Sequence, residues 1–399
     1  MFGRNVMVAV FNGRMLKERR KLYGVSQNKL AIVSGISREY LVRIEQGKKI
    51  PSHDLAMKLN ESLERFNPEA PLSLLIDYVR IRFPTTKVER IIEEILRLKF
   101  GYMLHEDYAF YGYQEQFVMG DIIVMLSSDK EKGVLLELKG RGCRQFENFL
   151  LAQSRSWYDF FIDALAVGGV MKRIDLAIND HTGILNIPEL IEQCQGEECI
   201  SLFRSFKSYR SGELVRRNEK EDMGSTLYIG SVKSEVYFCV YEKDYEQYIK
   251  LGIPPEDADT KNRFEIRLKN DRALFAIRDL IKSRNVERTT FSIINRYVRF
   301  TIKEEKKRRS QWRLQEQWAW FIGENRQELR LTTKPEPYTL ERTFRWLGRQ
   351  VAPTLRMGTM LDIINNTTKI KDMVDKAELS DRHKKIIEQL TAGIENLII

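Results

Sequence analysis

Acidic residues, a tyrosine and a lysine recur on segments of the chain whose apolar residues alternate as in β-strands. In 134–139, 173–178 and 263–269 the apolar residues occupy every second position, so the intervening residues share the opposite face of each strand. The same rule places Tyr241 and Lys243 on one face of 236–243. If these strands belong to one sheet, a single face carries, among arginines, Glu137, Asp175, Glu265, Tyr241 and Lys243.

Such a face is suited to phosphodiester chemistry. Two or three carboxylates together form an all-oxygen site that suits Mg²⁺ or Mn²⁺. A bound ion can polarise a phosphodiester, and a neighbouring tyrosine can attack phosphorus. A phenol with a pKa of ~10 is a poor nucleophile unless its ionisation is assisted, and Lys243 is placed to assist it or to neutralise phosphate charge. The alternative is an amphipathic sheet with one solvated, charged face, and the pattern alone leaves both interpretations open.

The residues on these strands lie within 70–272, which we predict to be an α+β region with a largely antiparallel sheet. Two amphipathic helix patterns, at 88–98 and 146–165, interrupt its β-forming runs. The remaining 273–399 is mainly helical and includes a basic, aromatic stretch at 306–320. This stretch is either a helix with a charged face or a surface that tracks a nucleic-acid backbone and stacks bases. Its DNA-binding candidates are Lys306, Lys307, Arg308, Arg309 and Trp312.

Residues 1–66 are expected to form a separate helical domain. Ser26 and Ser37 stand where they can cap two of four short helices over 12–65. The arrangement resembles repressor-type helix-turn-helix domains, whose second paired helix enters the major groove of duplex DNA. The resemblance implies that Gln27 lies near a phosphate. It also implies that the residues nearest the major groove are Arg38, Tyr40 and Arg43. The alternative is a generic helical bundle.

Composition favours a soluble protein with a polyanionic partner. The 399 residues carry 66 Lys and Arg against 56 Asp and Glu, a net charge of +10, which favours nucleic acid. No run approaches the ~18 uninterrupted apolar residues of a membrane span, and no signal peptide is recognisable. The four cysteines are too few and too scattered for a disulfide framework. We therefore expect a cytoplasmic protein with no membrane partner.

The motifs of several enzyme classes are missing from the sequence. The four histidines form neither a His-x-His nor an HExxH pair, which argues against a zinc hydrolase or a histidine-based nuclease. The sequence has no GxxxxGK[ST] motif and no GxSxG elbow, so no P-loop motor is expected. Cys194 and Cys199 lack partner ligands at zinc spacing. Any catalysis is therefore expected to use carboxylates and tyrosines.

Three blocks in order resemble the replication-initiation family of rolling-circle plasmids, a family also used by relaxases of conjugative transposons. They are RIDLAIND (173–180), STLYIGSVKSEVYFCVYEK (225–243) and RFEIRLK (263–269), and ELKGRGCRQFE (137–147) is similar to a further block of the transposon branch. The N-terminal helix-turn-helix also resembles that branch. The resemblance implies that Tyr241 is the nucleophile, with Mg²⁺ or Mn²⁺ held by Glu137, Asp175 and Glu265. The arginines expected to contact DNA on this face are Arg173, Arg263 and Arg267.

The chain departs from the family pattern at two positions. Cys239 stands where an arginine usually precedes the nucleophile, which weakens the expectation of a phosphate clamp there. Asn179 stands where the family often has Asp, so a ligand role for the following Asp180 is doubtful. Other tyrosines compete with Tyr241: Tyr228 at the turn, Tyr237 on the same face, and Tyr245, expected past the strand end.

The function implied by the resemblance is that of a conjugative-transposon relaxase. Tyr241 would nick one strand at the origin of transfer, form a 5′-phosphotyrosine, and allow religation without ATP. The helix-turn-helix would bind duplex DNA while the core holds a single strand, with a separate helicase and a coupling protein as partners. Monomer and homodimer both remain open. The alternatives are a plasmid replication initiator with the same chemistry, and a non-enzymatic helix-turn-helix transcription regulator that needs no metal.

Overall fold

The computed structural model describes most of the chain. The described residues are 13–22, 25–34, 36–64, 72–212, 222–323, 336, 339, 344 and 347–399. The chain divides into two compact units, each built from several segments. The first unit comprises Met1–Leu75, Asp175–Leu268 and Asn285–Thr332, and the second comprises Ile76–Ile174, Lys269–Arg284 and Thr333–Ile399. The bounds of these units differ from the predicted domains 1–66, 70–272 and 273–399. The division into three domains stays a prediction.

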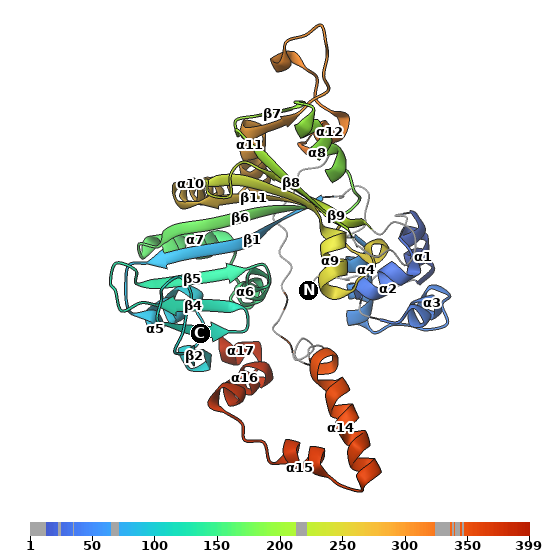
Figure 1. Cartoon of the computed structure of the whole chain (residues 1–399), viewed down its shortest axis with the longest axis vertical. Coiled ribbons are helices and arrows are strands. Elements are labelled where there is room, and N and C mark those ends of the chain that lie inside the picture. Colours follow the sequence, from blue (N-terminus) through green and yellow to red (C-terminus); the bar gives the residue numbers. More distant parts are fainter. Residues whose placement is uncertain are drawn as a thin grey trace, which may run out of the picture. The chain divides into compact units, whose positions relative to one another are not determined.

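Four helices at the start of the first unit form the predicted helix-turn-helix (Figure 1): α1 (Gly13–Leu22), α2 (Gln27–Ser34), α3 (Arg38–Glu45) and α4 (His53–Glu64). The Ser37 side chain caps α3 by accepting a hydrogen bond from the Tyr40 amide. A buried ion pair joins α1 to α3, with Arg20 Nε 2.5 Å from Glu45 Oε1. The small core between the helices is apolar and contains Leu16, Val25, Leu30, Ala31, Leu41, Ile44, Leu59 and Leu63.

In the sheet of the first unit, β8 (Phe206–Gly212), β9 (Asp222–Ile229), β10 (Val236–Glu242) and β11 (Asn262–Lys269) pair in antiparallel fashion. Beyond the second half of β6 (Val170–Asp180) the strand order is β11, β10, β9 and β8. The apolar residues of β10 and β11 are buried on one face, where Phe264 packs against Trp318 and Phe321 of α12 (Glu316–Phe321). The alternate residues of these strands therefore lie on the other face.

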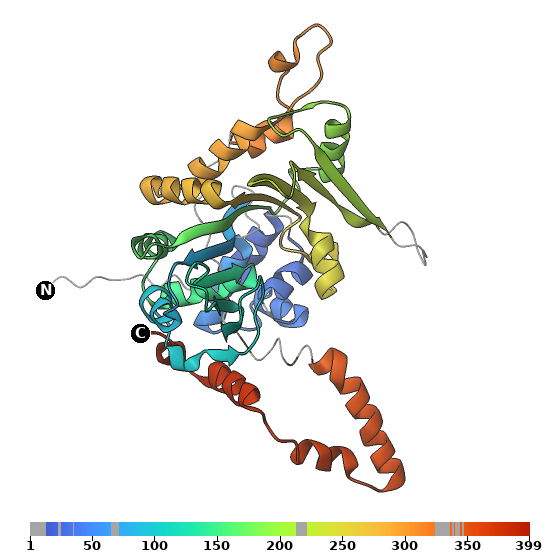
Figure 2. The same cartoon turned by 60° about the vertical axis from the view of Figure 1, so that its left-hand side comes forward.

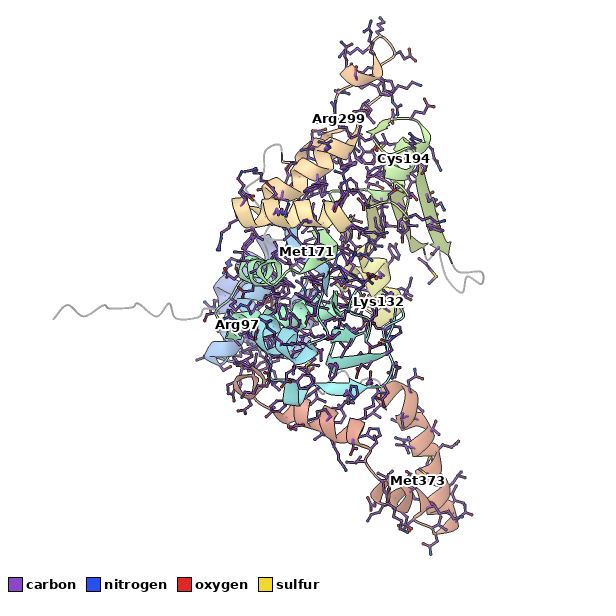
Figure 3. The ribbon with its side chains drawn as sticks, turned by 90° about the vertical axis from the view of Figure 1, so that its left-hand side faces the viewer. Arg97, Lys132, Met171, Cys194, Arg299 and Met373 are labelled. Carbon is purple, nitrogen blue, oxygen red and sulfur yellow. The ribbon has the colours of Figure 1, made fainter. Side chains whose placement is uncertain are left out.

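Further elements complete the first unit. The helices α8 (Ile187–Gln195), α9 (Lys243–Leu251) and α11 (Val286–Tyr297) accompany the sheet. A separate two-stranded sheet pairs β7 (Cys199–Ser201) with β12 (Val298–Phe300). Short 3₁₀ turns lie at η3 (Pro255–Asp257) and η4 (Arg309–Gln311). Figure 3 labels Cys194 near the end of α8; Cys194 and Cys199 are free thiols.

The strands of the second unit also form an antiparallel arrangement. Their order is β2 (Leu104–Glu106), β3 (Glu115–Met119), β4 (Ile122–Leu126), β5 (Val134–Lys139) and β1 (Leu72–Phe83). Helices of this unit include α6 (Arg141–Ala152), α7 (Trp157–Ala166) and α10 (Asn270–Ser283). The chain thus has the predicted fold class: an N-terminal helix-turn-helix, a central α+β part with a largely antiparallel sheet, and a helical C-terminal region.

Two predicted helices differ in detail from the structure. The 88–98 pattern forms α5 (Val88–Arg90) and a π-helical turn, η1 (Ile91–Leu96), which ends at Arg97 with φ of 52°. A 3₁₀ turn, η2 (Phe100–Tyr102), follows. The 146–165 pattern is split between α6 and α7. The split occurs because Ser156 and Asp159 form a capping box that starts a new helix, and Ser154 takes a positive φ of 53°.

The C-terminal helices belong to the second unit. They follow a π-helical turn, η5 (Leu347–Val351), and are α14 (Ala352–Asn365), α15 (Lys369–Asp375), α16 (Asp381–Thr391) and α17 (Ile394–Leu397). Gln389 of α16 donates to the carbonyls of Tyr102 and Val118, which ties this end of the chain to the strands. Figures 1 and 2 show α14 and α15 standing apart from those strands. No helix in the described residues is long and apolar enough to cross a bilayer.

Candidate active site

The hydroxyl of Tyr241 lies between a carboxylate and an ammonium group. Tyr241 donates a 2.9 Å hydrogen bond to Glu265 Oε1, and Lys243 Nζ lies 3.4 Å from the same hydroxyl oxygen. The strand register explains the first contact: Glu265 of β11 lies opposite Cys239 of β10, two residues from Tyr241 and on the same face. The side chains of Tyr241 and Lys243 are half-buried. Tyr241 and Lys243 are thus neighbours, as predicted, although Lys243 belongs to the helix that follows the strand.

Lys243 is held by the first turn of α9 rather than by the strand. The strand β10 ends at Glu242 and α9 begins at Lys243, so Lys243 forms an i,i+3 ion pair with Glu246. Glu246 also pairs with Lys250. Burial alone would raise the pKa of Glu246, but the two lysines outweigh burial and hold it below its usual value. Glu246 is thus an anion that positions the Lys243 ammonium beside Tyr241. Glu246 could have been found from the sequence, because it lies three residues after Lys243, the spacing of neighbours on one face of a helix.

The carboxylate of Glu265 has a second partner in Arg267. Arg267 Nε and Nη2 lie 2.9 and 2.6 Å from Glu265 Oε2, a two-pronged contact, and Nε lies 3.8 Å from Asp175 Oδ2. Arg267 Nη1 also donates to the Tyr237 hydroxyl at 3.3 Å. Burial alone would lower the pKa of Arg267, but Glu265 and other neighbours raise it, so the guanidinium stays charged. Asp175 and Glu265 are both buried.

The competing tyrosines of the first unit are placed differently from Tyr241. Tyr237 is buried and engages Arg267. Tyr228 lies opposite Cys239, and burial together with the Cys239 thiol raises its pKa to about 12, which disfavours a phenolate. Tyr245 lies in α9, past the strand end as predicted. Cys239, at the family's arginine position, is buried, and burial followed by the Glu265 charge raises its pKa to about 12.

Glu137 is the centre of a separate network in the second unit. Its fully buried carboxylate accepts hydrogen bonds from Tyr78, from Arg80 Nε at 2.9 Å and from Tyr111 at 3.1 Å, and pairs with Lys139 at 2.7 Å. Burial would raise the pKa of Glu137, but these donors hold it below its usual value. Tyr78 and Arg80 were missed at the sequence level, although polar and apolar residues alternate along this part of β1.

Two of the three predicted metal ligands, Asp175 and Glu265, lie in the first unit, and Glu137 lies in the second. Among the residues that the structure describes, no group of three or more His, Cys, Asp and Glu side chains could hold a metal ion. Carboxylate oxygens suit Mg²⁺ and Mn²⁺ chemically. However, Glu137 is surrounded by its own donors, and Arg267 engages Glu265 and approaches Asp175. In this conformation the residues do not fit a three-carboxylate metal centre.

The other arginines predicted to contact DNA have protein partners. The guanidinium of Arg173 lies 4.0 Å from the centre of the Tyr78 ring in the second unit, a cation–π contact. Arg263 Nε donates to Asn179 Oδ1 at 2.8 Å. Asp180 organises the turn after β6, since it accepts from the amides of residues 182, 183 and 185 and from Asn262. Its role is therefore structural, in agreement with the doubt raised by the family pattern.

The predicted duplex-binding residues differ in exposure. Arg38 and Arg43 are exposed on α3, whereas Tyr40 is half-buried against the helix-turn-helix core. Gln27 Nε2 donates to Glu45 Oε2 at 2.8 Å and so supports the buried Arg20–Glu45 pair. The two exposed arginines are therefore the side chains best placed to reach DNA from this helix.

The basic stretch has an exposed part and a buried part. The side chains of Lys306, Lys307, Arg308 and Arg309 are exposed. Trp312 is buried, and its indole N–H lies 3.1 and 3.2 Å from the carbonyls of Glu304 and Lys307. This corrects the expectation that Trp312 offers its ring to unpaired bases, because the ring instead closes the loop that carries the four basic residues.

Comparisons with known proteins agree with this architecture. Residues 169–374 match the family described as replication initiation factor, 73–163 match the rolling circle replication initiation protein N-terminal domain, and 16–65 match a helix-turn-helix family. The chain belongs to the replication initiation factor family and is an enzyme of the relaxase and rolling-circle initiator class.

Two relatives document the likeness in sequence and in structure. The chain is 40% identical to the putative DNA relaxase NicK of Bacillus subtilis over 332 residues, which cover 83% of this chain and 93% of the relative. It is also similar to the solved rolling circle replication initiator protein of Geobacillus stearothermophilus, with a TM-score of 0.57 and 25% identity. That match covers 66% of this chain and 99% of the other.

Proposed function

We propose that the chain is the relaxase of a conjugative transposon and that Tyr241 is its nucleophile. The observation that carries this proposal is the Tyr241 hydroxyl held between Glu265 and Lys243. Its hydroxyl combines a carboxylate acceptor with a neighbouring ammonium, whereas Tyr237 engages Arg267 and Tyr228 lies beside Cys239. The 40% identity to a protein named as a DNA relaxase supports transfer as the biological use.

The contacts of Tyr241 suggest how its hydroxyl is activated. Glu265 Oε1 accepts the phenolic proton, and the Lys243 ammonium stabilises the phenolate that forms. The phenolate oxygen then attacks the scissile phosphorus while the bond to the 3′ oxygen breaks. The leaving 3′ oxygen takes up the proton that Glu265 accepted, so the products are a 5′-phosphotyrosine and a 3′ hydroxyl. Because the ester retains the bond energy, the reverse attack by a 3′ hydroxyl rejoins the strand without ATP.

Mg²⁺ or Mn²⁺ dependence is part of the proposal. The predicted ligands remain Glu137, Asp175 and Glu265. A bound ion would polarise the scissile phosphate. Among the described residues, no group of three or more acidic, His or Cys side chains is close enough together to hold the ion.

DNA is proposed to bind in two ways. Arg38 and Arg43 of α3 would contact duplex near the origin of transfer, while the strand to be cut lies near Tyr241. The exposed run Lys306–Arg309 would add contacts to the phosphate backbone. The protein would act in the cytoplasm with a separate helicase and a coupling protein, and as a monomer or a homodimer.

Covalent capture tests the proposal. Full-length protein is incubated with labelled single strands of the element's own candidate origin, with and without Mn²⁺, and then denatured. We expect a shifted, metal-dependent band that is lost in Tyr241→Phe and kept in the matched variant Tyr228→Phe. An adduct that persists in Tyr241→Phe would reject the nucleophile assignment.

A second candidate is initiation of rolling-circle plasmid replication with the same chemistry. The likeness to the solved initiator favours it, since 99% of that chain is covered. The two uses are distinguished by supplying the protein in cells with either an origin of transfer or a plasmid origin and measuring DNA transfer and plasmid copy number. If the chain were instead a non-enzymatic regulator, it would bind duplex DNA and form no covalent adduct with any strand.

A further inference from the structure

The loop between β2 and β3 in the second unit carries exposed aromatic side chains. This loop covers 107–114, and three of its rings belong to residues that are 51%, 52% and 51% exposed: Tyr108, Phe110 and Tyr111. The rings of Phe110 and Tyr111 are neighbours, with centres 6.4 Å apart and planes inclined by 57°. Large rings that gather on one surface loop leave apolar area in water unless a partner covers it. The loop is therefore a candidate interaction surface.

The turn within this loop holds a tyrosine in a backbone conformation that favours glycine. The Tyr113 amide donates to the Phe110 carbonyl at 3.0 Å, and between them Tyr111 and Gly112 have φ of 58° and 73°. Lys132, labelled in Figure 3, fixes the turn by donating to the Gly112 carbonyl at 3.0 Å. A bulky side chain at positive φ is strained, and such residues cluster at functional sites. Asparagine or glycine would form the turn with less strain, so the turn itself does not need the Tyr111 ring.

The ring of Tyr111 is held in place although the residue is half exposed. Its hydroxyl accepts a hydrogen bond from Arg80 Nη2 at 2.7 Å and donates one to Glu137 Oε1 at 3.1 Å. The Arg80 guanidinium also lies 4.3 Å from the centre of the ring, a cation–π contact. Because the ring is already ordered, it loses little conformational entropy when a planar ligand stacks on it.

Positive charge surrounds the Glu137 carboxylate to which Tyr111 is bonded. Arg80 and Lys139 both pair with Glu137, and the Lys139 side chain is half exposed. Arg173 stacks on the ring of Tyr78, whose hydroxyl donates to the same carboxylate. Three cations thus gather around one anion, and the surplus favours a phosphate. Positive charge beside exposed rings is typical of surfaces that bind single-stranded nucleic acid, where cations follow the backbone and rings stack bases.

We propose that Phe110 and Tyr111 stack on unpaired bases of single-stranded DNA while Lys139 contacts its phosphates. The surface would recognise the unpaired state rather than a sequence, because every base offers an aromatic face. In a duplex the bases already stack on one another, so the two rings do not add to duplex affinity. The inference rests on the proposed function for the identity of the ligand as the strand that is nicked.

The stacking is tested with two labelled strands of equal phosphate number, each of about 12 nucleotides: a thymidine oligonucleotide and the same strand without bases. Fluorescence anisotropy with full-length protein gives the ratio of their affinities, in which phosphate contacts cancel. The double variant Phe110→Ala, Tyr111→Asn is expected to lower this ratio at least about fivefold, the lower range for lost base stacking. Asparagine replaces the tyrosine because it tolerates positive φ.

Three further variants separate the contributions to binding. Tyr111→Phe keeps the ring and is expected to keep the ratio within about twofold of wild type. Phe275→Ala removes a similarly exposed ring from α10 of the same unit and should leave the ratio unchanged. Lys139→Gln is expected to weaken both strands equally and to lower the slope of log affinity against log salt by about 0.7. An unchanged slope would contradict the phosphate contact.

An affinity ratio that is the same in the double variant and in wild type would overturn the proposal. Circular dichroism checks that the variant is folded. If it does not fold, Phe110→Ala alone decides, because phenylalanine has no hydroxyl to remove from the hydrogen bonds of Glu137, and an unchanged ratio there would also overturn the proposal. The affinity ratio is independent of covalent capture, so an adduct lost in Tyr241→Phe can stand when this inference fails, and the reverse is also true.

Discussion

The hydroxyl of Tyr241 on β10 donates to Glu265 on β11 across 2.9 Å, although the two residues are 24 positions apart in the sequence. The antiparallel register places them diagonally on one face, and no intervening side chain is needed to join them. The contact gives the phenol a proton acceptor in its resting geometry.

Tyr241→Phe is expected to abolish formation of the covalent DNA adduct and leave duplex binding within about twofold of wild type. The reason is that the phenolic oxygen is the attacking atom, whereas the helix-turn-helix contacts are separate side chains. Gel analysis of denatured reactions measures the first property and fluorescence anisotropy with duplex DNA the second. Loss of both properties would indicate a misfolded protein instead.

Lys243→Ala is expected to slow nicking at least about tenfold because the phenolate loses its neighbouring ammonium. Lys250→Ala is the matched control, since Lys250 also pairs with Glu246 but its side chain is exposed. Single-turnover nicking rates at saturating DNA separate the two variants. Equal rates in both would remove Lys243 from the chemistry.

Glu137→Gln is expected to lower the free energy of unfolding by about 3 kcal/mol at neutral pH. The carboxylate is fully buried and accepts hydrogen bonds from Tyr78, Arg80 and Tyr111, so its replacement leaves charged donors without their anion. Urea unfolding measures this loss, and the exposed Glu131→Gln provides the control. A loss no larger than that of the control would contradict a structural role for the network.

The same carboxylate predicts an acid-dependent loss of stability. The folded-state pKa of Glu137 lies below its ordinary value of 4.5, so between the two values the unfolded chain binds more protons than the folded one. The stabilisation is therefore fully present above pH 4.5 and is lost as the pH falls through the folded pKa. Unfolding curves at several pH values should show the wild type and Glu137→Gln converging as the pH falls below that value. A difference in unfolding free energy between the two proteins that stays constant down to about pH 3 would contradict a lowered pKa of Glu137 in the folded state.

Arg43→Ala is expected to weaken duplex binding several-fold and to lower the slope of log affinity against log salt by about one. Arg43 is exposed on α3, whereas the neighbouring Glu45 is buried against Arg20. Arg90→Ala is the control, because Arg90 is an exposed arginine in a surface pair with Glu94. Titrations at several salt concentrations supply both numbers. An unchanged slope would place DNA elsewhere than on this helix.

The local structure and part of the site could be predicted from the amino-acid sequence. Strand alternation and helix caps act over a few residues, so the four N-terminal helices and the strands could be predicted. Tyr241 and Lys243 are close because they are two residues apart, although Lys243 lies in α9 and not on the predicted strand. The order of three motif blocks was enough to predict the family, because each block keeps its residues at set offsets along one strand or along two neighbouring strands.

The ion-pair partners of the charged side chains depend on the tertiary fold. Alternation puts Glu265 and Arg267 on one face of β11, but whether the arginine faces DNA or a carboxylate depends on neighbours from other strands, here Asp175 and Tyr237. Likewise, Trp312 is buried with its indole N–H against the carbonyls of Glu304 and Lys307, which no period of the sequence encodes. Burial and ion pairing depend on three-dimensional neighbours, and for that reason the chemistry of this site follows from the fold rather than from the motif.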